Sequence, residues 1–194
     1  MIIVLLPAYN EEISFPPLME KLKHALEETN EDYRLLVCND GSTDNTSKIL
    51  EEYSANFPLE VIEHRINRGL GESSRDLFER AVELGKKGDI IIRMDCDDTH
   101  EPKYIPNIIR KLNQGYDVVV ASRFEKGGGQ MGVNGYRAFI SRGANLFMKI
   151  FFPISGLKEY SCGYRGYRYK QIKDAIDFLE TTLSSLKDWV LPAL

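Results

Sequence analysis

Short apolar runs alternate with amphipathic segments from the first residue to about residue 121. The runs expected to form strands are residues 2–6, 33–38, 59–62, 89–94 and 117–121, each bounded by polar or glycine-containing turns. The segments between them carry apolar residues at helical spacing, such as Leu18, Leu22 and Leu26. Strands that alternate with helices predict an α/β fold, in which helices cover both faces of a mostly parallel sheet.

The length and composition fit one domain with a substantial core. The chain has 194 residues, of which 43% are hydrophobic, and this excludes a disordered or collagen-like protein. Its three cysteines are odd in number and far apart, so neither a disulfide framework nor a zinc site is indicated, and we expect a cytoplasmic protein. No apolar run approaches the ~18 residues of a membrane-spanning helix, and the N-terminal run is too short for a signal peptide.

Charge is distributed unevenly along the chain. The formal net charge is −4, but residues 1–122 carry 14 basic and 23 acidic side chains, whereas residues 123–173 carry 10 basic and 2 acidic ones. An asymmetry of this kind in a small chain indicates an anionic partner at one region. A solvated surface without function is the alternative interpretation.

Acidic loops follow three of the predicted strands. Since ligands of parallel sheets bind beyond the carboxyl ends of the strands, these loops are expected to meet at one site. Asp40, Asp95, Asp97 and Asp98 would concentrate negative charge there, which destabilises the fold unless a cation offsets it. The Asp95-x-Asp97 spacing suits a divalent cation or its phosphate complex, although a solvated turn is the alternative for such a pair taken alone.

Two further residues near these loops have open interpretations. Ser42, Thr43 or Asp44 can cap the helix that follows, which leaves Asp40 free to accept hydrogen bonds from the edge of a nucleobase. Tyr9 either packs in the core or stacks on a base or ribose.

Four motifs occur together and in a fixed order. They are Pro7-Ala8-Tyr9-Asn10-Glu11-Glu12, Asp40-Gly41-Ser42-Thr43-Asp44, the Asp95-x-Asp97 turn with His100 and Pro102, and Ser141-Arg142-Gly143-Ala144-Asn145. On these motifs the chain resembles family 2 glycosyltransferases with a GT-A fold, and within them the polyprenyl-phosphate glycosyltransferases. The resemblance covers residues 1 to about 170 and implies a Rossmann-like three-layer sandwich.

The resemblance also implies roles for individual residues. Pro7, Tyr9 and Glu11 would contact the nucleobase and ribose, and Asp40 would read the edge of the base. Asp95 and Asp97 would serve the ribose and the metal-bound diphosphate, with Mg²⁺ or Mn²⁺ as the cofactor. The sequence departs from relatives at Leu70, where a Lys is common, at Thr99, where relatives often have Gln or Ser, and at Glu159, which replaces an Asp.

The basic segment bears on the choice of acceptor. A hydroxyl acceptor needs a general base, whereas a phosphomonoester is already largely dianionic at neutral pH and needs only positioning and charge neutralisation, which arginines provide. The segment supplies five arginines: Arg123, Arg137, Arg142, Arg165 and Arg168. We assign two of them, Arg123 and Arg142, to catalysis together with Asp97. A structural ion pair is the alternative for each arginine taken singly.

Apolar residues between positions 137 and 157 alternate with basic ones. This pattern is typical either of a helix that packs on the sheet or of an amphipathic segment at a membrane surface. A last helix is expected from about residue 170 to 186.

Together these observations predict an inverting, metal-dependent glycosyltransferase that acts peripherally at the cytoplasmic face of a membrane. It would move a hexose, mannose or glucose, from a GDP- or UDP-linked donor to a dolichyl or undecaprenyl phosphate. Residues 1–194 are expected as one domain, in which residues 1–122 bind the nucleotide sugar and residues 123–173 bind the acceptor. Transfer to a glycan hydroxyl, or a catalytically impaired nucleotide-sugar-binding module, are the alternatives, and nucleic acid is not an expected partner.

Overall fold

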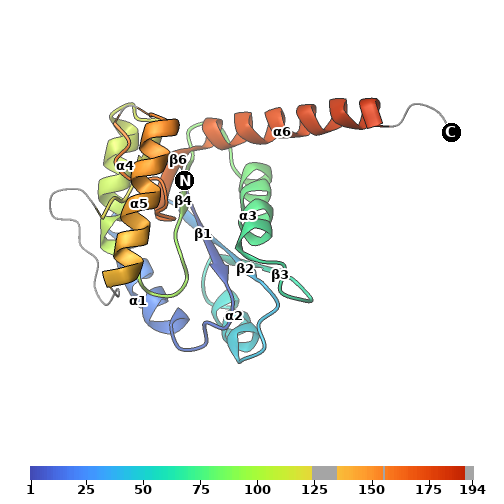
Figure 1. Ribbon diagram of the computed structural model, residues 1–194. Coiled ribbons are helices and arrows are strands. Elements are labelled where there is room, and N and C mark those ends of the chain that lie inside the picture. Colours follow the sequence, from blue (N-terminus) through green and yellow to red (C-terminus); the bar gives the residue numbers. More distant parts are fainter. Residues whose placement is uncertain (124–134, 155, 191–194) are drawn as a thin grey trace.

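The structure is a computed structural model that describes residues 1–123, 135–154 and 156–190, and its centre is a six-stranded sheet of order β3-β2-β1-β4-β6-β5 (Figure 1). The strands are β1 (Ile2–Ala8), β2 (Tyr33–Asn39), β3 (Leu59–Glu63), β4 (Ile90–Arg93), β5 (Val118–Val120) and β6 (Arg165–Arg168). β1 pairs in parallel with β2 and β4, and β2 pairs in parallel with β3. β6 is antiparallel to both of its neighbours, β4 and β5. The mostly parallel sheet predicted from the sequence is thus confirmed.

Helices lie on both faces of the sheet. They are α1 (Phe15–Glu27), α2 (Thr46–Ser54), α3 (Leu70–Leu84), the 3-10 helix η1 (Pro102–Tyr104), α4 (Ile105–Asn113), α5 (Gly135–Phe151) and α6 (Tyr169–Val190). Alternate residues of the buried strand β1 point to opposite faces, so Val4 and Leu6 pack with α1, α2 and α4, while Ile3 and Leu5 pack with α3 and the start of α6. This arrangement is the predicted three-layer sandwich.

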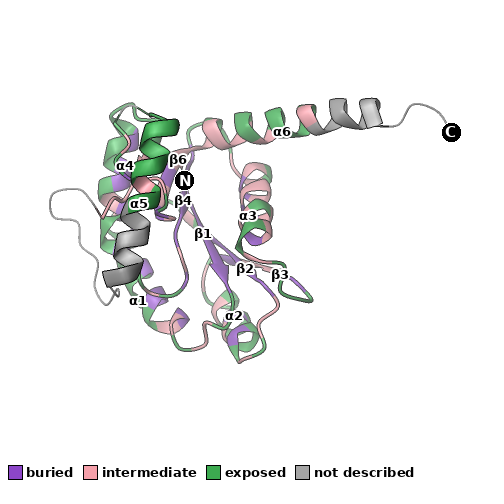
Figure 2. Ribbon diagram, in the orientation of Figure 1, coloured by how far each residue is buried: buried purple, intermediate pink, exposed green. Residues whose placement is uncertain are grey.

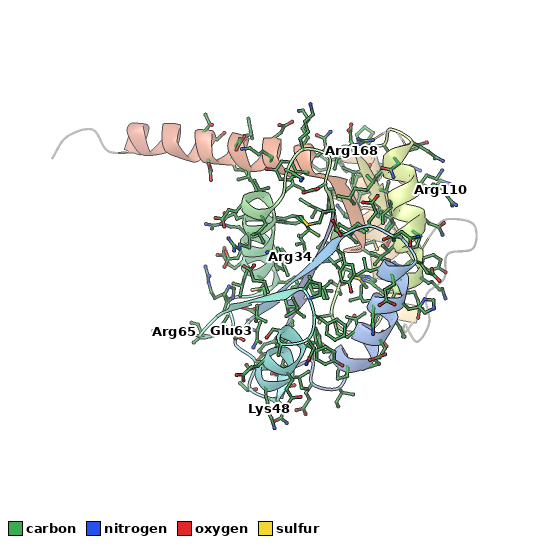
Figure 3. The ribbon with its side chains drawn as sticks, turned by 180° about the vertical axis from the view of Figure 1, so that it is seen from behind. Arg34, Lys48, Glu63, Arg65, Arg110 and Arg168 are labelled. Carbon is green, nitrogen blue, oxygen red and sulfur yellow. The ribbon has the colours of Figure 1, made fainter. Side chains whose placement is uncertain are left out.

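Strand β6 is an element that the sequence pattern did not predict. Gly166, at its centre, packs under α4 so closely that an added Cβ atom would lie 2.2 Å from a methyl group of Ile108. Arg165 Nε donates to the Cys162 carbonyl at 2.6 Å, and Arg168 Nε donates to the Tyr116 carbonyl at 3.1 Å. Figure 3 shows Arg168 beside α4. Hydrogen bonds and close packing, rather than a run of apolar residues, therefore hold this strand in the sheet.

Helix α5 carries an exposed apolar surface. From Gly143 to Ile154, every side chain except that of Asn145 is exposed, and Figure 2 shows this part of the helix in green. Asn145 ties the helix to the body, because its side chain donates to the Lys158 carbonyl at 2.8 Å and accepts from the Tyr160 N–H at 2.8 Å. The sequence pattern left open whether this segment packs on the sheet or lies at a membrane surface. Residues 143–154 are not buried against the sheet.

Helix α6 begins on the sheet and extends beyond it (Figure 1). Tyr169 and Ile172 pack with α3, whereas Phe178 and Leu179 are exposed. Among the described residues, no helix combines the length and apolar character needed to span a bilayer.

Candidate active site

A cleft lies at the carboxyl ends of β1, β2 and β4. Its volume is about 340 Å³, and six residues predicted to bind the donor line it: Pro7, Tyr9, Glu11, Asp40, Asp95 and Asp97. The loop between β3 and α3, with Asn67 and Gly69, and the start of α3, with Leu70 and Ser73, close another side of the cleft. Residues far apart in the sequence are therefore brought to one edge of the sheet, as expected for a parallel α/β fold.

The loop after β1 presents one aromatic and one acidic side chain to the cleft. Tyr9 is 46% exposed, so packing in the core is not its role. The backbone N–H of Glu11 donates to Thr46 Oγ1 at 2.8 Å, which fixes this loop to the start of α2. Burial raises the pKa of the Glu11 carboxyl, and the charges of Asp97, Asp44 and Asp95 raise it further despite a hydrogen bond from Ser14. The cleft is thus an environment that favours added positive charge.

Asp40 is 4% exposed and accepts three hydrogen bonds from the protein. Its Oδ1 accepts from His64 Nδ1 at 2.6 Å and from the Arg68 N–H at 2.9 Å, and its Oδ2 accepts from the Gly69 N–H at 2.8 Å. Burial acts to raise the pKa of this carboxyl, but these bonds outweigh it and lower the pKa below the usual value. Since a carboxylate offers about four acceptor positions, Oδ2 retains one for a ligand in the cleft.

Of the three residues after Gly41 that the sequence offered as caps, Asp44 bonds to the start of α2, whereas Ser42 and Thr43 bond to the loop after β1 through Asn10. Asp44 Oδ1 accepts from the Thr46 N–H at 3.0 Å, and Asp44 Oδ2 accepts from the Glu12 N–H at 3.2 Å. Asp44 therefore stabilises the start of α2 and the loop after β1 rather than lining the cleft.

Asp95 and Asp97 leave β4 in a tight turn. Asp95 Oδ1 lies 2.8 Å from Arg93 Nη2, and the Asp95 backbone N–H donates to His100 Nδ1 at 2.9 Å. The hydrogen bonds of Asp97 come from the Thr99 N–H and hydroxyl, and both reach its Oδ1. Asp97 Oδ2 accepts no hydrogen bond from any described residue, so this exposed carboxylate can serve a ligand in the cleft.

The acidic residue that follows has a structural role. Asp98 adopts a positive φ of 56°, and both of its carboxylate oxygens lie 2.9 Å from Lys21 Nζ on α1. This ion pair fixes the turn against α1 and engages Asp98, whereas Asp95 and Asp97 line the cleft.

The donor set fits a divalent cation that is shared with a diphosphate. No three His, Cys, Asp or Glu side chains gather as a metal site within residues 1–123, 143–154 and 156–182. Mg²⁺ in nucleotide sites is commonly held by one or two carboxylates together with phosphate oxygens. Asp95 and Asp97 meet that requirement.

Of the two arginines predicted at the acceptor, the structure describes the side chain of Arg123. Arg123 forms an ion pair with the fully buried Glu159: its backbone N–H donates to Oε2 at 2.7 Å, and its Nε donates to Oε1 at 2.6 Å. Arg142 lies on α5, but its side chain is outside the described residues. Neither arginine lines the cleft as far as the structure describes it, and their roles in catalysis stay predictions.

Several residues of the site were not predicted from the sequence. His64 and Asp76 lie behind Asp40, and Arg93 partners Asp95. Arg68 pairs with Asp76 at 3.1 Å and with Glu72 at 2.7 Å. The acidic partners of these basic side chains could not be assigned without the fold.

The sheet, the helices on both of its faces and the cleft with its paired aspartates define a GT-A glycosyltransferase fold. The sequence model of glycosyl transferase family 2 matches residues 3–175, and the chain belongs to that family.

Two curated relatives are similar over most of this chain. The dolichol-phosphate mannosyltransferase of Pyrococcus furiosus is 31% identical over 175 residues, which cover 90% of this chain and 47% of the relative. An undecaprenyl-phosphate 4-deoxy-4-formamido-L-arabinose transferase of Proteus mirabilis is 31% identical over 182 residues, which cover 89% of this chain and 50% of the relative. The chain thus spans about half the length of the curated relatives it matches.

A solved structure confirms the fold. Glucosyl-3-phosphoglycerate synthase from Mycobacterium tuberculosis, crystallised with Mn²⁺ and UDP-glucose, superimposes with a TM-score of 0.62 at 22% identity, over 88% of this chain and 56% of that one.

Proposed function

We propose that this chain transfers a sugar from a nucleoside-diphosphate sugar to the phosphate of a polyprenyl lipid, with inversion at the anomeric carbon. The observation that carries the proposal is the cleft that brings Tyr9, Asp40, Asp95 and Asp97 to the carboxyl ends of the strands. The names of two relatives that are 31% identical to this chain over the aligned residues support the polyprenyl phosphate as acceptor.

The donor would lie with its nucleobase between Tyr9 and Asp40. The exposed ring of Tyr9 offers a stacking surface, and the remaining acceptor position on Asp40 Oδ2 suits an N–H donor on the base. The diphosphate would lie toward Asp95 and Asp97. The choice between UDP and GDP and the identity of the sugar, for which mannose and glucose are our candidates, belong to the proposal.

Asp95 and Asp97 would hold Mg²⁺ or Mn²⁺ together with the diphosphate. A bound divalent ion offsets the negative charge that develops on the leaving diphosphate. Burial is the main cause of the raised pKa of Glu11, and the charges of Asp97, Asp44 and Asp95 add to it. A cation in the cleft would offset those charges. A relative in fold, solved with Mn²⁺ and UDP-glucose, adds support.

The acceptor needs no general base of the protein. A phosphate monoester has a second pKa near ~6 and is largely dianionic at neutral pH, so an oxygen atom is already nucleophilic. The basic segment 123–173 would hold this phosphate beside the sugar, with Arg142 as our candidate clamp, and catalysis would come from positioning and electrostatics. One oxygen of the lipid phosphate forms the new bond to the anomeric carbon as the bond to the nucleoside diphosphate breaks.

The exposed apolar surface of α5 would rest on the membrane that holds the lipid. Its large apolar side chains are 36–63% exposed; they are Leu146, Phe147, Met148, Ile150, Phe151, Phe152 and Ile154. An amphipathic segment with aromatic and basic residues suits the interface of a bilayer. We assign this membrane surface to the cytoplasmic face, which the free cysteines Cys38, Cys96 and Cys162 fit.

The test is a transfer assay with a choice of acceptors. UDP- and GDP-linked radiolabelled mannose and glucose are incubated with the chain, MnCl₂ or MgCl₂, and vesicles that contain either undecaprenyl or dolichyl phosphate or the corresponding polyprenol. The proposal predicts label in the organic phase with the phosphate and not with the alcohol. Label on the polyprenol would favour a hydroxyl acceptor, and the absence of both transfer and donor hydrolysis would favour a binding module.

A further inference from the structure

His64 lies immediately after β3, beneath the cleft, and its side chain is 4% exposed. Figure 3 labels its sequence neighbours Glu63 and Arg65 at this end of the sheet. The two ring nitrogens of His64 face two different aspartates. Nδ1 lies 2.6 Å from Asp40 Oδ1, and Nε2 lies 2.8 Å from Asp76 Oδ2 on α3.

This geometry favours a proton on both ring nitrogens, although Arg68 Nη1 lies 3.4 Å from Nε2 and its charge acts against the second proton. An ionised carboxylate only accepts hydrogen bonds, and a neutral imidazole carries one N–H, so a neutral ring would turn a lone pair toward one of the two aspartates. The doubly protonated ring satisfies both. Burial acts to lower the pKa of His64, but the hydrogen bonds to Asp40 and Asp76 outweigh it and raise the pKa above the usual value.

The ionisable groups around the ring balance its charge. Asp40 and Asp76 contribute two negative charges, and Arg68 Nη1, which lies 3.1 Å from Asp76 Oδ2, contributes one positive charge. The thiol of Cys38 lies 3.5 Å from Nε2, and burial raises its pKa to about 11, so it stays neutral. Arg68 also pairs with Glu72 at 2.7 Å, so its charge is shared. A protonated His64 adds a positive charge between the two aspartates, whereas an uncharged His64 would leave the buried Asp40 carboxylate without a cationic partner among the described residues.

Asp40 in turn holds the loop that closes the cleft. Its two oxygens accept from the backbone N–H groups of Arg68 and Gly69, and Gly69 and Asn67 line the cleft. The orientation of Asp40 therefore sets both the shape of this loop and the direction of the acceptor position that faces the cleft. His64 is the side chain that fixes this orientation from behind.

We propose that His64 is a positioning residue for donor binding. It donates hydrogen bonds from both ring nitrogens and thereby holds Asp40 and the loop of residues 67–69 in the shape that receives the nucleobase. This inference rests on the proposed function for the identity of the ligand. It predicts that donor affinity depends on a proton that the donor itself never contacts.

The sign of the pH dependence follows from the raised pKa of His64. The stabilisation is complete below the unperturbed value of about 6.5 and is lost as the pH rises through the raised pKa. Donor binding should therefore weaken on the alkaline side, over the pH range in which His64 loses its proton.

Two variants separate the two hydrogen bonds of the ring. Asn at position 64 places its amide nitrogen near the position of Nδ1 and can donate to Asp40, whereas Gln places its nitrogen near Nε2 and can donate to Asp76. Neither side chain titrates in this range. His64→Asn should keep the affinity for the donor nucleotide and lose its pH dependence, and His64→Gln should bind about tenfold more weakly.

The experiment combines calorimetry and nuclear magnetic resonance on the whole chain. In the calorimetry, UDP and GDP with MnCl₂ are titrated into wild type and both variants from pH 6 to 9. In the magnetic resonance experiment, without nucleotide, we follow the exchange of the Arg68 and Gly69 amide protons and the ring ¹⁵N shifts of His64. We expect two protonated ring nitrogens at pH 7, and faster exchange of both amides in His64→Gln but not in His64→Asn.

The outcomes distinguish the two proposals. A neutral His64 ring at pH 7, or equal nucleotide affinity and amide exchange in wild type and His64→Gln, would overturn the positioning role. If neither UDP nor GDP binds to wild type while the exchange pattern is as expected, the positioning role stands and the proposed function fails. The ring measurement on wild type decides the matter even if a variant does not fold.

Discussion

Gly41 supplies a sharp test of how the donor cleft is assembled. It lies directly after Asp40 at a φ of +69°, and an added Cβ atom would lie 2.5 Å from the carbonyl carbon of Ile66 and 2.6 Å from the backbone nitrogen of Asn67. Both contacts are to backbone, which cannot swing away as a side chain can. In Gly41→Ala the loop would have to retreat by about 0.9 Å to restore an ordinary contact of 3.4 Å.

That retreat determines the expected magnitude. The hydrogen bonds from the Arg68 and Gly69 N–H groups to Asp40, now 2.9 and 2.8 Å, would lengthen beyond a normal hydrogen bond of up to about 3.2 Å. Losing one bond to a charged acceptor costs about 1.5–3 kcal/mol, and the left-handed backbone adds about 1–3 kcal/mol. Together these give at least about 2.5 kcal/mol, or a loss of at least about 5 °C in Tm for a chain of this size.

Two other glycines serve as controls. Gly69 has a φ of +90° but open space around its Cβ position, so Gly69→Ala carries the backbone strain without the clash. Gly71, in the first turn of α3, has open space and an ordinary φ, so Gly71→Ala should be neutral or slightly stabilising. Thermal denaturation followed by circular dichroism, with nucleotide titration of each folded variant, gives the ranking. A Tm for Gly41→Ala within about 2 °C of wild type, less than 1 kcal/mol for a chain of this size, would refute the close packing of the loop on Gly41.

Four further outcomes follow from the site and its surroundings. Asp97→Asn should lower transfer by about 100-fold or more with an unchanged Tm, because Asp97 is exposed; near-normal turnover would remove Asp97 from the cation site. Glu159→Ala should lower the free energy of unfolding, measured by urea denaturation, by about 2–3 kcal/mol. This is less than the cost of breaking a fully buried ion pair, because the Arg123 side chain is 28% exposed. An unchanged free energy of unfolding would show that the pair is not structural. Arg142→Ala should raise the KM for the lipid phosphate more than the Kd for the nucleotide, whereas equal losses would make it structural. Phe151→Asp should reduce flotation with anionic vesicles, and unchanged flotation would place the membrane contact elsewhere.

The parts of the fold that depend on local patterns were predictable. The five apolar runs became β1 to β5, and the apolar spacing located α1, α3 and α4, because side chains in a parallel sheet and its covering helices are buried in a periodic way. β6 was missed, since Arg165 to Arg168 form a strand only through pairing with β4 and β5 and through the space that Gly166 leaves for α4.

The same distinction holds for the site. The loops after the strands could be placed at one edge because topology dictates it, and six predicted residues do line the cleft. The partners of each charge could not be derived, because Asp40 and His64 are 24 residues apart and Arg123 and Glu159 are 36 residues apart. Arg123 was assigned to the acceptor from its charge and its place after the fifth predicted strand, and the structure shows that its guanidinium is paired with a buried carboxylate.

The structure of the reaction product tests the central claim most directly. We would extract the lipid product formed from a nucleoside-diphosphate sugar and a polyprenyl phosphate, and determine its linkage by ³¹P and ¹H nuclear magnetic resonance. A single displacement by the lipid phosphate predicts a glycosyl phosphodiester with an anomeric configuration opposite to that of the donor. A sugar attached through a carbon-bound hydroxyl, or a phosphodiester that retains the donor configuration, would contradict the account.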